Sequence, residues 1–167
     1  MFLGHSQINF PALVEEYYKP LYRFAYSLAG NEHEACDLTQ QTFCIYARKG
    51  QAIEKAAKVK SWLFTTLYRE FLKLRRKAQR TTPVDHETLD YEAPHVSVDM
   101  VKKIDSSRAV DSLQAVDEVY RTPLTLFYLK HHSYQEIADV LDIPLGTVMS
   151  RISRGKTQLK KVLTNPS

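Results

Sequence analysis

The side chains with the clearest chemistry lie near the end of the chain, on one face of a helix predicted to begin at about Leu145. That face carries hydroxyl, thioether and cationic groups and no acid: Thr147, Met149, Ser150, Arg151, Ser153, Arg154 and Lys156. Hydroxyl and guanidinium groups donate hydrogen bonds to base edges, and cations pair with phosphates. The face therefore predicts a helix that lies in the major groove of DNA.

The residues before this helix supply the element that must position it. Ser133 is a good N-cap, and Glu136 stands three residues later, as a capping box requires. Ile137, Ala138 and Leu141 follow as an apolar helical face, and Pro144 ends the run before the next helix starts. The spacing predicts a helix-turn-helix in which Val148 and Ile152 face inward. The alternative is an ordinary helical hairpin with a solvated basic face.

A second set of candidate DNA contacts lies on a basic helix predicted from about Val59 to Ala78. Its predicted core stripe is Leu63, Leu67, Phe71 and Leu74. Its other faces carry hydroxyl, aromatic and cationic side chains: Lys60, Trp62, Thr65, Thr66, Arg69, Lys73, Arg76 and Lys77. Aromatic rings beside cations suit single-stranded bases that have left the stack. Trp62 fits the core equally well, and residues 51–58 fit either a helix or a loop.

The charge pattern divides the chain. Residues 55–80 hold nine basic residues and one acid, and residues 81–118 hold nine acids and three basic residues. From Leu145 onward there are five basic residues and no acid. With a net charge of +4 and a pI of about 9.0, this pattern favours two nucleic-acid contacts joined by a connector that does not bind.

The remaining periodicities are helical, so the predicted fold is all-α, with two small helical domains joined by a flexible acidic linker. Residues 10–28 form one amphipathic stripe that Pro20 should kink or divide, and a helix from Glu32 or Glu34 to Arg48 follows. The second domain restarts with a stripe at Ala109, Leu113, Val116 and Tyr120, and Pro123 begins a short helix with Leu124, Phe127 and Tyr128 facing inward. The predicted boundaries are 8–80, a linker at 81–107 and a helix-turn-helix domain at 108–164.

Several classes of protein are disfavoured. Cys36 and Cys44 are too few for a disulfide framework, and His33 with Cys36 lacks the second ligand pair of a zinc site. His131-His132 is predicted to be a surface turn. No P-loop, nucleophile elbow or acid pair is present, so we expect no enzyme activity, cofactor or metal. No apolar run approaches membrane-spanning length, and the N-terminus lacks a signal-peptide pattern, which favours a cytoplasmic setting.

With these elements in order, residues 10–163 resemble a bacterial sigma-70 family sigma factor of the extracytoplasmic-function (ECF) group. Three segments carry the resemblance: residues 21–25 with 37–43, Trp62-Leu63-Phe64 with the basic helix after it, and residues 120–121 with 133–138 and 146–151. The resemblance implies docking on the clamp helices of core RNA polymerase, melting of the −10 promoter element and reading of the −35 element, respectively. It assigns polymerase binding to Asp37, Gln40, Gln41 and Phe43. It implies core polymerase and promoter DNA as partners, and an anti-sigma factor as a further one.

The chain departs from the family pattern at four positions. Gln41 stands where the family has an acid, and Met149 stands where many members have arginine. The family usually has an asparagine near the position of Arg69 and an aspartate near that of Lys73, and both residues are basic in this chain. Promoter sequence therefore does not transfer from a relative. The competing hypothesis is a conventional helix-turn-helix regulator whose N-terminal domain senses a ligand or dimerises, and the basic block at 55–80 favours the sigma factor.

Overall fold

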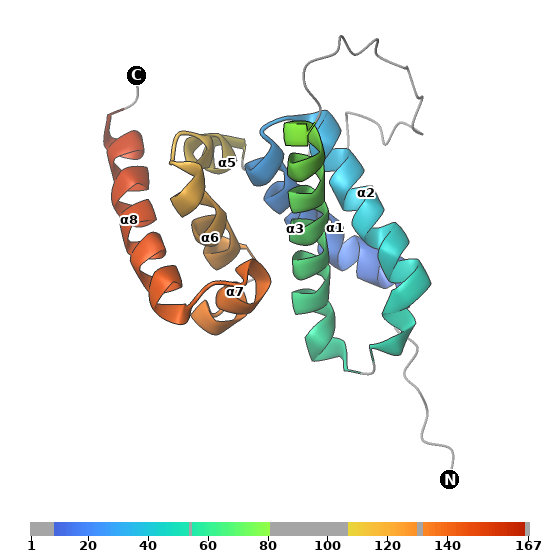
Figure 1. Ribbon diagram of the computed structural model, residues 1–167. Helices are drawn as coiled ribbons and strands as arrows, with labels where there is room; N and C mark the ends of the chain where they lie inside the picture. The colour runs from blue at the N-terminus through green and yellow to red at the C-terminus, as the bar shows by residue number, and fades with distance from the viewer. Residues whose placement is uncertain (1–8, 54, 81–106, 130–131, 166–167) are drawn as a thin grey trace.

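The computed structural model describes residues 9–53, 55–80, 107–129 and 132–165, and in these ranges every regular element is helical (Figure 1). The elements in chain order are α1 (Phe10–Ala29), α2 (Glu32–Lys49), a 3₁₀ turn (Gly50–Ala52), α3 (Ala56–Arg80), α5 (Ser107–Gln114), α6 (Glu118–Tyr128), α7 (Tyr134–Leu141) and α8 (Leu145–Thr164). The predicted all-α class is confirmed. The predicted linker at 81–107 lies outside the described residues except for its last position.

Local signals place the ends of α1 and α2. Asn9 and Asn31 cap the two helices with their side-chain oxygens, and Gly30 ends α1 in the left-handed region at φ 76°. Pro20 does not divide α1, which runs through it as one helix. Glu32 and Glu34 lie in the first turn of α2, and Arg48 and Lys49 in its last, as the helix dipole favours.

The basic helix α3 is longer than its sequence pattern predicted. The ambiguous segment at 51–58 contains the end of the 3₁₀ turn and the first residues of α3, and its residue 54 lies outside the described residues. Leu63, Leu67 and Phe71 are buried as predicted, but Leu74 is 49% exposed, so its assignment to the core was wrong. Every residue from 73 to 80 is exposed, because the last two turns of α3 extend beyond the apolar core.

The start of the C-terminal half also differs from prediction. The single stripe expected from Ala109 to Tyr120 belongs to two helices, since α5 ends at Gln114 and α6 begins at Glu118. Pro123 lies inside α6 and does not begin a helix, and this costs α6 one backbone hydrogen bond. Leu124 is buried, but Tyr128 is 52% exposed, so its inward assignment was wrong.

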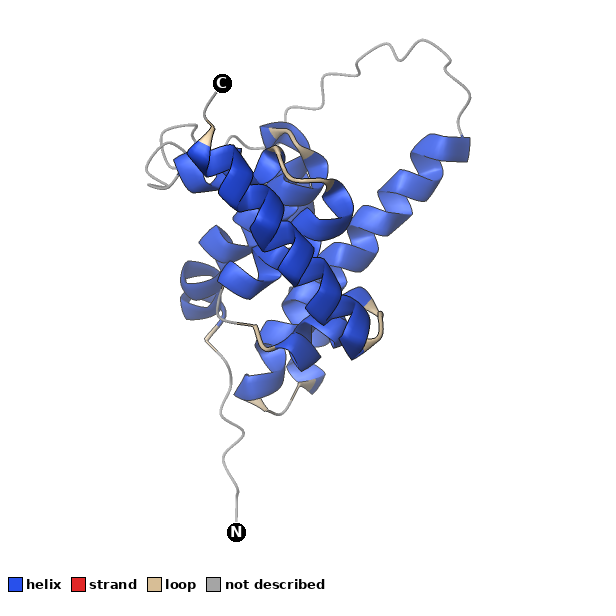
Figure 2. Ribbon diagram, turned by 90° about the vertical axis from the view of Figure 1, so that its left-hand side faces the viewer, coloured by secondary structure: helices blue, strands red, loops and turns tan. Residues whose placement is uncertain are grey.

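Helices α1–α3, here called the N-terminal unit, pack against one another, and α5–α8, the C-terminal unit, pack beside them (Figures 1 and 2). The two units touch where α7 lies against α3 and where α5 and α6 lie against α1. Buried apolar side chains continue from one unit into the other as one cluster. In the part of the chain that is described, no helix has the length and apolar character to cross a membrane.

Helix α8 approaches α6 closely at Gly155, which is buried. A Cβ atom added there would lie 3.3 Å from the Cβ and the backbone oxygen of Tyr120 and from a methyl group of Leu124. Two of these three atoms belong to or adjoin the backbone and cannot turn away. Gly155 therefore sets the spacing of the two helices that hold the candidate recognition face.

We expect Gly155→Leu to lower the free energy of unfolding by about 1–3 kcal/mol, since an overpacked contact forces the helices apart. Urea denaturation followed by circular dichroism measures this loss. Gly146→Leu is the matched control, because nothing lies within 4 Å of a Cβ at Gly146. An equal effect of the two substitutions would show that the close approach at Gly155 does not matter for stability.

Candidate nucleic-acid interface

The helix-turn-helix forms as its sequence signals predicted. The Ser133 hydroxyl accepts a bond from the Glu136 N–H at 3.1 Å, and the Glu136 carboxylate accepts one from the Ser133 N–H at 2.6 Å. Asp142 turns the chain with a positive φ of 53°, and Pro144 precedes α8. Val148 and Ile152 are fully buried and fix the rotation of α8.

The predicted recognition residues divide into two groups on α8. Met149, Ser150, Ser153 and Arg154 are exposed on the open side of the helix, and Thr147 is half-buried beside them. Arg151 is half-buried and lies near Tyr68 of α3, and the Lys156 ammonium lies 4.5 Å from the centre of the Phe127 ring. The open face thus combines a cation, two hydroxyls and a thioether, which suits base edges.

A groove of about 410 Å³ lies between α2 and α3. Its lining contains four of the predicted downstream contacts together with residues from α2: Gln41, Ile45, Arg48, Lys49, Trp62, Thr66, Arg69, Glu70 and Lys73. Trp62 is half-buried and meets the edge of Tyr46 at 5.6 Å between ring centres, so it both packs and lines the groove. An aromatic wall surrounded by cations can hold an unstacked base and the phosphates beside it.

Sequence reasoning missed the contribution of α2 to this groove. It treated Arg48 and Lys49 only as charges that complement the helix dipole, and it placed Gln41 on the polymerase side. The position of Gln41, Ile45 and Arg48 along one side of α2, at i, i+4 and i+7, was the available signal. Glu70 was also missed, and its carboxylate pairs with Lys73 at 2.6 Å.

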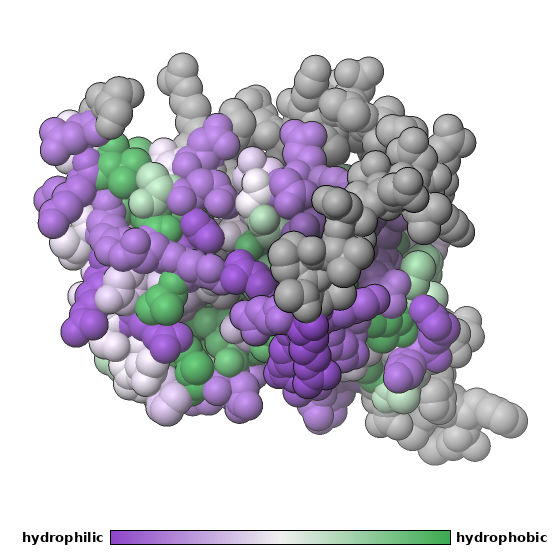
Figure 3. Space-filling view, turned by 45° about the horizontal axis from the view of Figure 1, so that its top comes forward, coloured by the Kyte–Doolittle hydropathy of each residue, from purple (hydrophilic) through white to green (hydrophobic). Residues whose placement is uncertain are grey.

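The other candidate contacts of α3 lie outside this groove. The Lys60 ammonium is 3.2 Å from the Glu136 carboxylate of α7 and only 19% exposed. Thr65 is half-buried, and Arg76 and Lys77 lie on the exposed end of the helix with Arg80. In Figure 3 the atoms drawn in colour on this side of the molecule are predominantly hydrophilic, with hydrophobic ones in separate patches. The exposed end of α3 therefore suits phosphate contacts.

The predicted polymerase-binding residues are not all on the surface. Asp37 is exposed and lies 3.5 Å from the His33 ring, and Gln40 is half-buried one turn along. Phe43 is only 7% exposed, and its ring packs against Phe10 and Tyr18. Phe43 therefore holds α1 and α2 together and offers no outer contact in this structure.

His132 corrects a second prediction. It was assigned to a surface turn with His131, which lies outside the described residues, but His132 is only 2% exposed. Its ring meets Phe64 edge-on, with centres 4.5 Å apart. Among the described residues no group of three or more potential metal ligands is present, and neither His132 nor His33 belongs to one.

Burial and local charges shift several pKa values at the contact of the two units. Burial raises the pKa of Glu136, but the Ser133 N–H and the Lys60 ammonium outweigh it, and the pKa ends below its usual value. Burial also lowers the pKa of His132 and raises that of Tyr68. Glu136 is therefore an anion near neutral pH, and it partly neutralises the cationic surface of α3.

Two family profiles match the chain. The profile described as Sigma-70 region 2 matches residues 13–81, which cover most of α1–α3 and the groove. The profile described as Sigma-70, region 4 matches residues 108–159, which contain the helix-turn-helix and the recognition face. Both candidate surfaces therefore lie inside recognised segments of one family.

Similar proteins agree with these profiles. The chain is 34% identical over 162 residues to the ECF RNA polymerase sigma factor SigE of Mycolicibacterium smegmatis, covering 93% of this chain and 62% of that protein. It is 27% identical to the ECF RNA polymerase sigma factor SigW of Bacillus subtilis, covering 95% and 90%. The sigma factor RpoE of Bartonella quintana, solved in complex with the anti-sigma factor NepR, has the same fold, with a TM-score of 0.70 and 24% identity over 95% of this chain and 98% of that one.

These matches also decide between the two hypotheses. A conventional regulator with a sensing domain is not favoured, because the N-terminal unit matches region 2 of a sigma factor. An initiation factor of this kind is not an enzyme. The chain belongs to the sigma-70 family, in its extracytoplasmic-function group of alternative sigma factors that direct transcription initiation.

Proposed function

We propose that this sigma factor divides promoter recognition among three surfaces. The open face of α8 reads the −35 element, and the groove between α2 and α3 holds bases of the −10 element after strands separate. The exposed side of α2 around Asp37 and Gln40 docks on core RNA polymerase. The corresponding division into domains at 8–80 and 108–164 is part of the same proposal.

The observation that carries the proposal is the composition of the groove. Trp62 supplies a ring, Thr66 a hydroxyl, and Arg48, Lys49 and Arg69 supply cations. Stacking of a base on an aromatic ring is worth roughly 1–3 kcal/mol, which offsets much of the cost of unstacking that base. The cations stabilise the phosphates of the same strand. The groove thus favours the open form of the duplex over the paired form.

The proposed partners follow from the family and from the charges. Promoter DNA suits the cationic end of α3 and the acid-free face of α8. Core polymerase acts in the cytoplasm, so we infer that this chain does too. Because RpoE is solved with the anti-sigma factor NepR and CnrH with the cytosolic domain of CnrY, we also propose an anti-sigma factor as a partner.

Run-off transcription with core polymerase and fragments of the source genome tests the function as a whole. We expect specific transcripts only when the chain is added, from templates that share two dissimilar elements. Specific binding of the chain alone to a palindromic duplex, without any effect on initiation, would instead favour the conventional regulator.

Substitutions in the groove should slow strand opening without weakening the binding of duplex promoter DNA. We expect Thr66→Ala and Arg69→Ala to leave closed-complex affinity near normal and to slow opening by about tenfold or more, since about 1.4 kcal/mol of lost stabilisation is a factor of ten. Permanganate footprinting on linear and pre-melted templates measures this. Equal defects on the pre-melted template and in duplex binding would place the melting function elsewhere.

The open face of α8 predicts a change in sequence preference. Arg154→Ala should weaken binding by about 1–3 kcal/mol and relax preference at one position of the −35 element, if the guanidinium bonds to a guanine. A panel of promoter variants measures the preference. Thr157→Ala is a control on the same helix, because its hydroxyl is bonded to the Ser153 carbonyl. A uniform loss on all sequences would assign Arg154 to phosphate contact.

The exposed side of α2 predicts a loss of polymerase affinity without loss of folding. Asp37→Arg should reduce polymerase binding, because it reverses the charge at the proposed interface. It should change the free energy of unfolding by about 0.5 kcal/mol or less, as is usual for an exposed residue. Pull-down of core polymerase measures the first effect and thermal denaturation the second. Leu38→Asp is the folding control, since Leu38 is buried. Unchanged polymerase affinity for Asp37→Arg would contradict the docking site.

A further inference from the structure

The two units meet along α1, which lies against α5 and α6, and along α3, which lies against α7. The second of these contacts involves the N-terminal end of α7. We call the four central residues, Lys60, Phe64, His132 and Glu136, the latch. Phe64 is fully buried against His132, and Lys60 pairs with Glu136 at 3.2 Å. The Glu136 carboxylate also completes the capping box at the start of α7. One carboxylate therefore both caps α7, the first helix of the helix-turn-helix, and pairs with α3, the helix proposed to open DNA.

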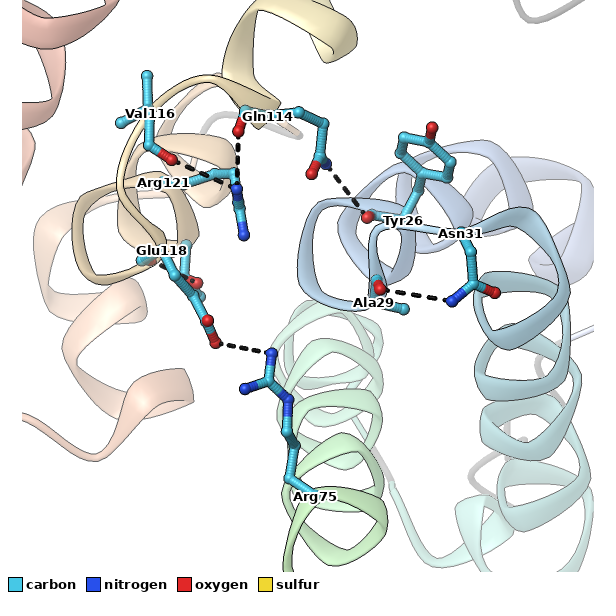
Figure 4. A network of polar contacts seen from close by, with 9 residues as sticks. Tyr26, Ala29, Asn31, Arg75, Gln114, Val116, Glu118 and Arg121 are labelled. Atoms are coloured by element: carbon cyan, nitrogen blue, oxygen red, sulfur yellow. Dashed lines mark hydrogen bonds and ion pairs between the residues drawn. The ribbon is translucent and has the colours of Figure 1, made fainter. Parts of the chain in front are cut away.

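Polar contacts continue the interface away from the latch (Figure 4). The Gln114 amide of α5 donates to the Tyr26 carbonyl of α1 at 3.2 Å, and Arg75 of α3 pairs with Glu118 of α6 at 3.2 Å. Arg121 donates to the Gln114 and Val116 carbonyls and holds the turn that presents Gln114. The units are therefore docked through specific contacts along their whole boundary.

His132 is suited to this position only in its neutral form. Its Nδ1 lies 3.0 Å from the Leu126 carbonyl and 2.7 Å from the Leu129 carbonyl, and carbonyl oxygens only accept, so Nδ1 carries the proton. Its Nε2 is buried without a hydrogen-bond partner among the described residues. A second proton on Nε2 would be a buried donor without an acceptor. The protonated ring would also lie beside the Lys60 cation of α3, and the Glu136 carboxylate of α7 already pairs with Lys60 and with the Ser133 N–H.

The docked arrangement cannot contact both promoter elements at once. The −35 and −10 elements lie about 25 base pairs apart, which is about 85 Å along B-form DNA at roughly 3.4 Å per base pair. A compact chain of 167 residues has a radius of gyration of about 15 Å, hence a diameter of about 40 Å. The two units must separate before α8 and the groove engage their elements together.

We propose that the free chain rests in this docked form, that the latch holds it there against simultaneous binding of the two promoter elements, and that protonation of His132 releases it. In the docked form the Glu136 carboxylate pairs with Lys60, one of the candidate contacts to the downstream promoter element. The consequence for transcription rests on the proposed function, whereas the docking itself does not.

The direction of the pH effect follows from burial. Burial lowers the pKa of His132 in the docked form, and the Lys60 charge adds to this effect, whereas the bonds to the Leu129 and Leu126 carbonyls and the Glu136 charge oppose it. Separation of the units removes Phe64 and Lys60 from His132, so its pKa rises toward the ordinary value of about 6.5. The docked form is therefore fully stabilised above about pH 6.5 and loses stability as the pH falls below that value.

Small-angle X-ray scattering of the full chain without polymerase or DNA tests the proposal. At pH 7.5 we expect a radius of gyration near that of one compact body, about 15 Å, and on separation an increase to about 20–25 Å. Wild type at pH 5.5 should expand. Glu136→Gln keeps a capping acceptor but removes the charge, and His132→Asn keeps a donor for the two carbonyls but removes the ring; both should be expanded at pH 7.5.

Asp139→Asn is the matched control on α7, because Asp139 is exposed and accepts a hydrogen bond from Gln135 of the same helix. It should stay compact at pH 7.5. Far-UV circular dichroism verifies that helix content is retained, and the wild-type pH series needs no substitution. A wild-type chain already expanded at pH 7.5, or both latch variants as compact as wild type, overturns the proposal.

Affinity of the free chain for a duplex that carries both promoter elements gives a second readout. If only the separated form can contact both elements, the apparent affinity falls with the fraction of chains that are separated, so His132→Asn should bind this duplex several-fold more tightly than wild type. Equal affinities, with expansion confirmed by scattering, would show that docking exists but does not inhibit. That result would leave the proposed function intact and overturn the inhibitory role of the latch.

Discussion

The burial of three side chains of α3 determines how the rest of the molecule is arranged. Leu63, Leu67 and Phe71 lie in the apolar core at 5% exposure or less, and burial of each is worth roughly 1.5–3 kcal/mol. This fixes the rotation of α3 about its axis. The face of α3 that carries Trp62 and Thr66 then meets α2 and forms the groove. The face that carries Lys60 and Phe64 meets the C-terminal unit. A single helix thus supplies both the proposed site of strand opening and the surface on which the C-terminal unit docks.

Helix α8 separates folding from recognition in a similar way. Val148, Ile152 and Gly155 face α6 and α7 and set the position of the helix, whereas Met149, Ser150 and Arg154 face outward. Substitutions on the outer face should therefore change promoter choice with little effect on stability. Met149 is 51% exposed, so packing does not constrain which side chain stands at this position.

The features that could be predicted from the sequence depend on neighbouring residues in the chain. The Ser133–Glu136 capping box, the left-handed Gly30 and the buried pair Val148 and Ile152 all follow from local spacing. The errors involve contacts between distant segments. Leu74 continues the apolar period of α3 but lies past the core, and His132 looks like part of a polar turn until Phe64 is brought against it. Periodicity shows which side chains share a face, but it cannot show where the partner element ends or which face a second unit covers.

Fluorescence of 2-aminopurine tests most directly whether the groove holds an unstacked base. The probe replaces single bases of the −10 element in fork-junction DNA from a promoter defined by run-off transcription, and holoenzyme is added. At one position we expect emission to be quenched by wild type and by Trp62→Phe, which can both stack, and to be bright with Trp62→Leu, which keeps apolar bulk but has no ring. Equal emission with all three proteins at every position would contradict the account, because the base would then not lie against Trp62.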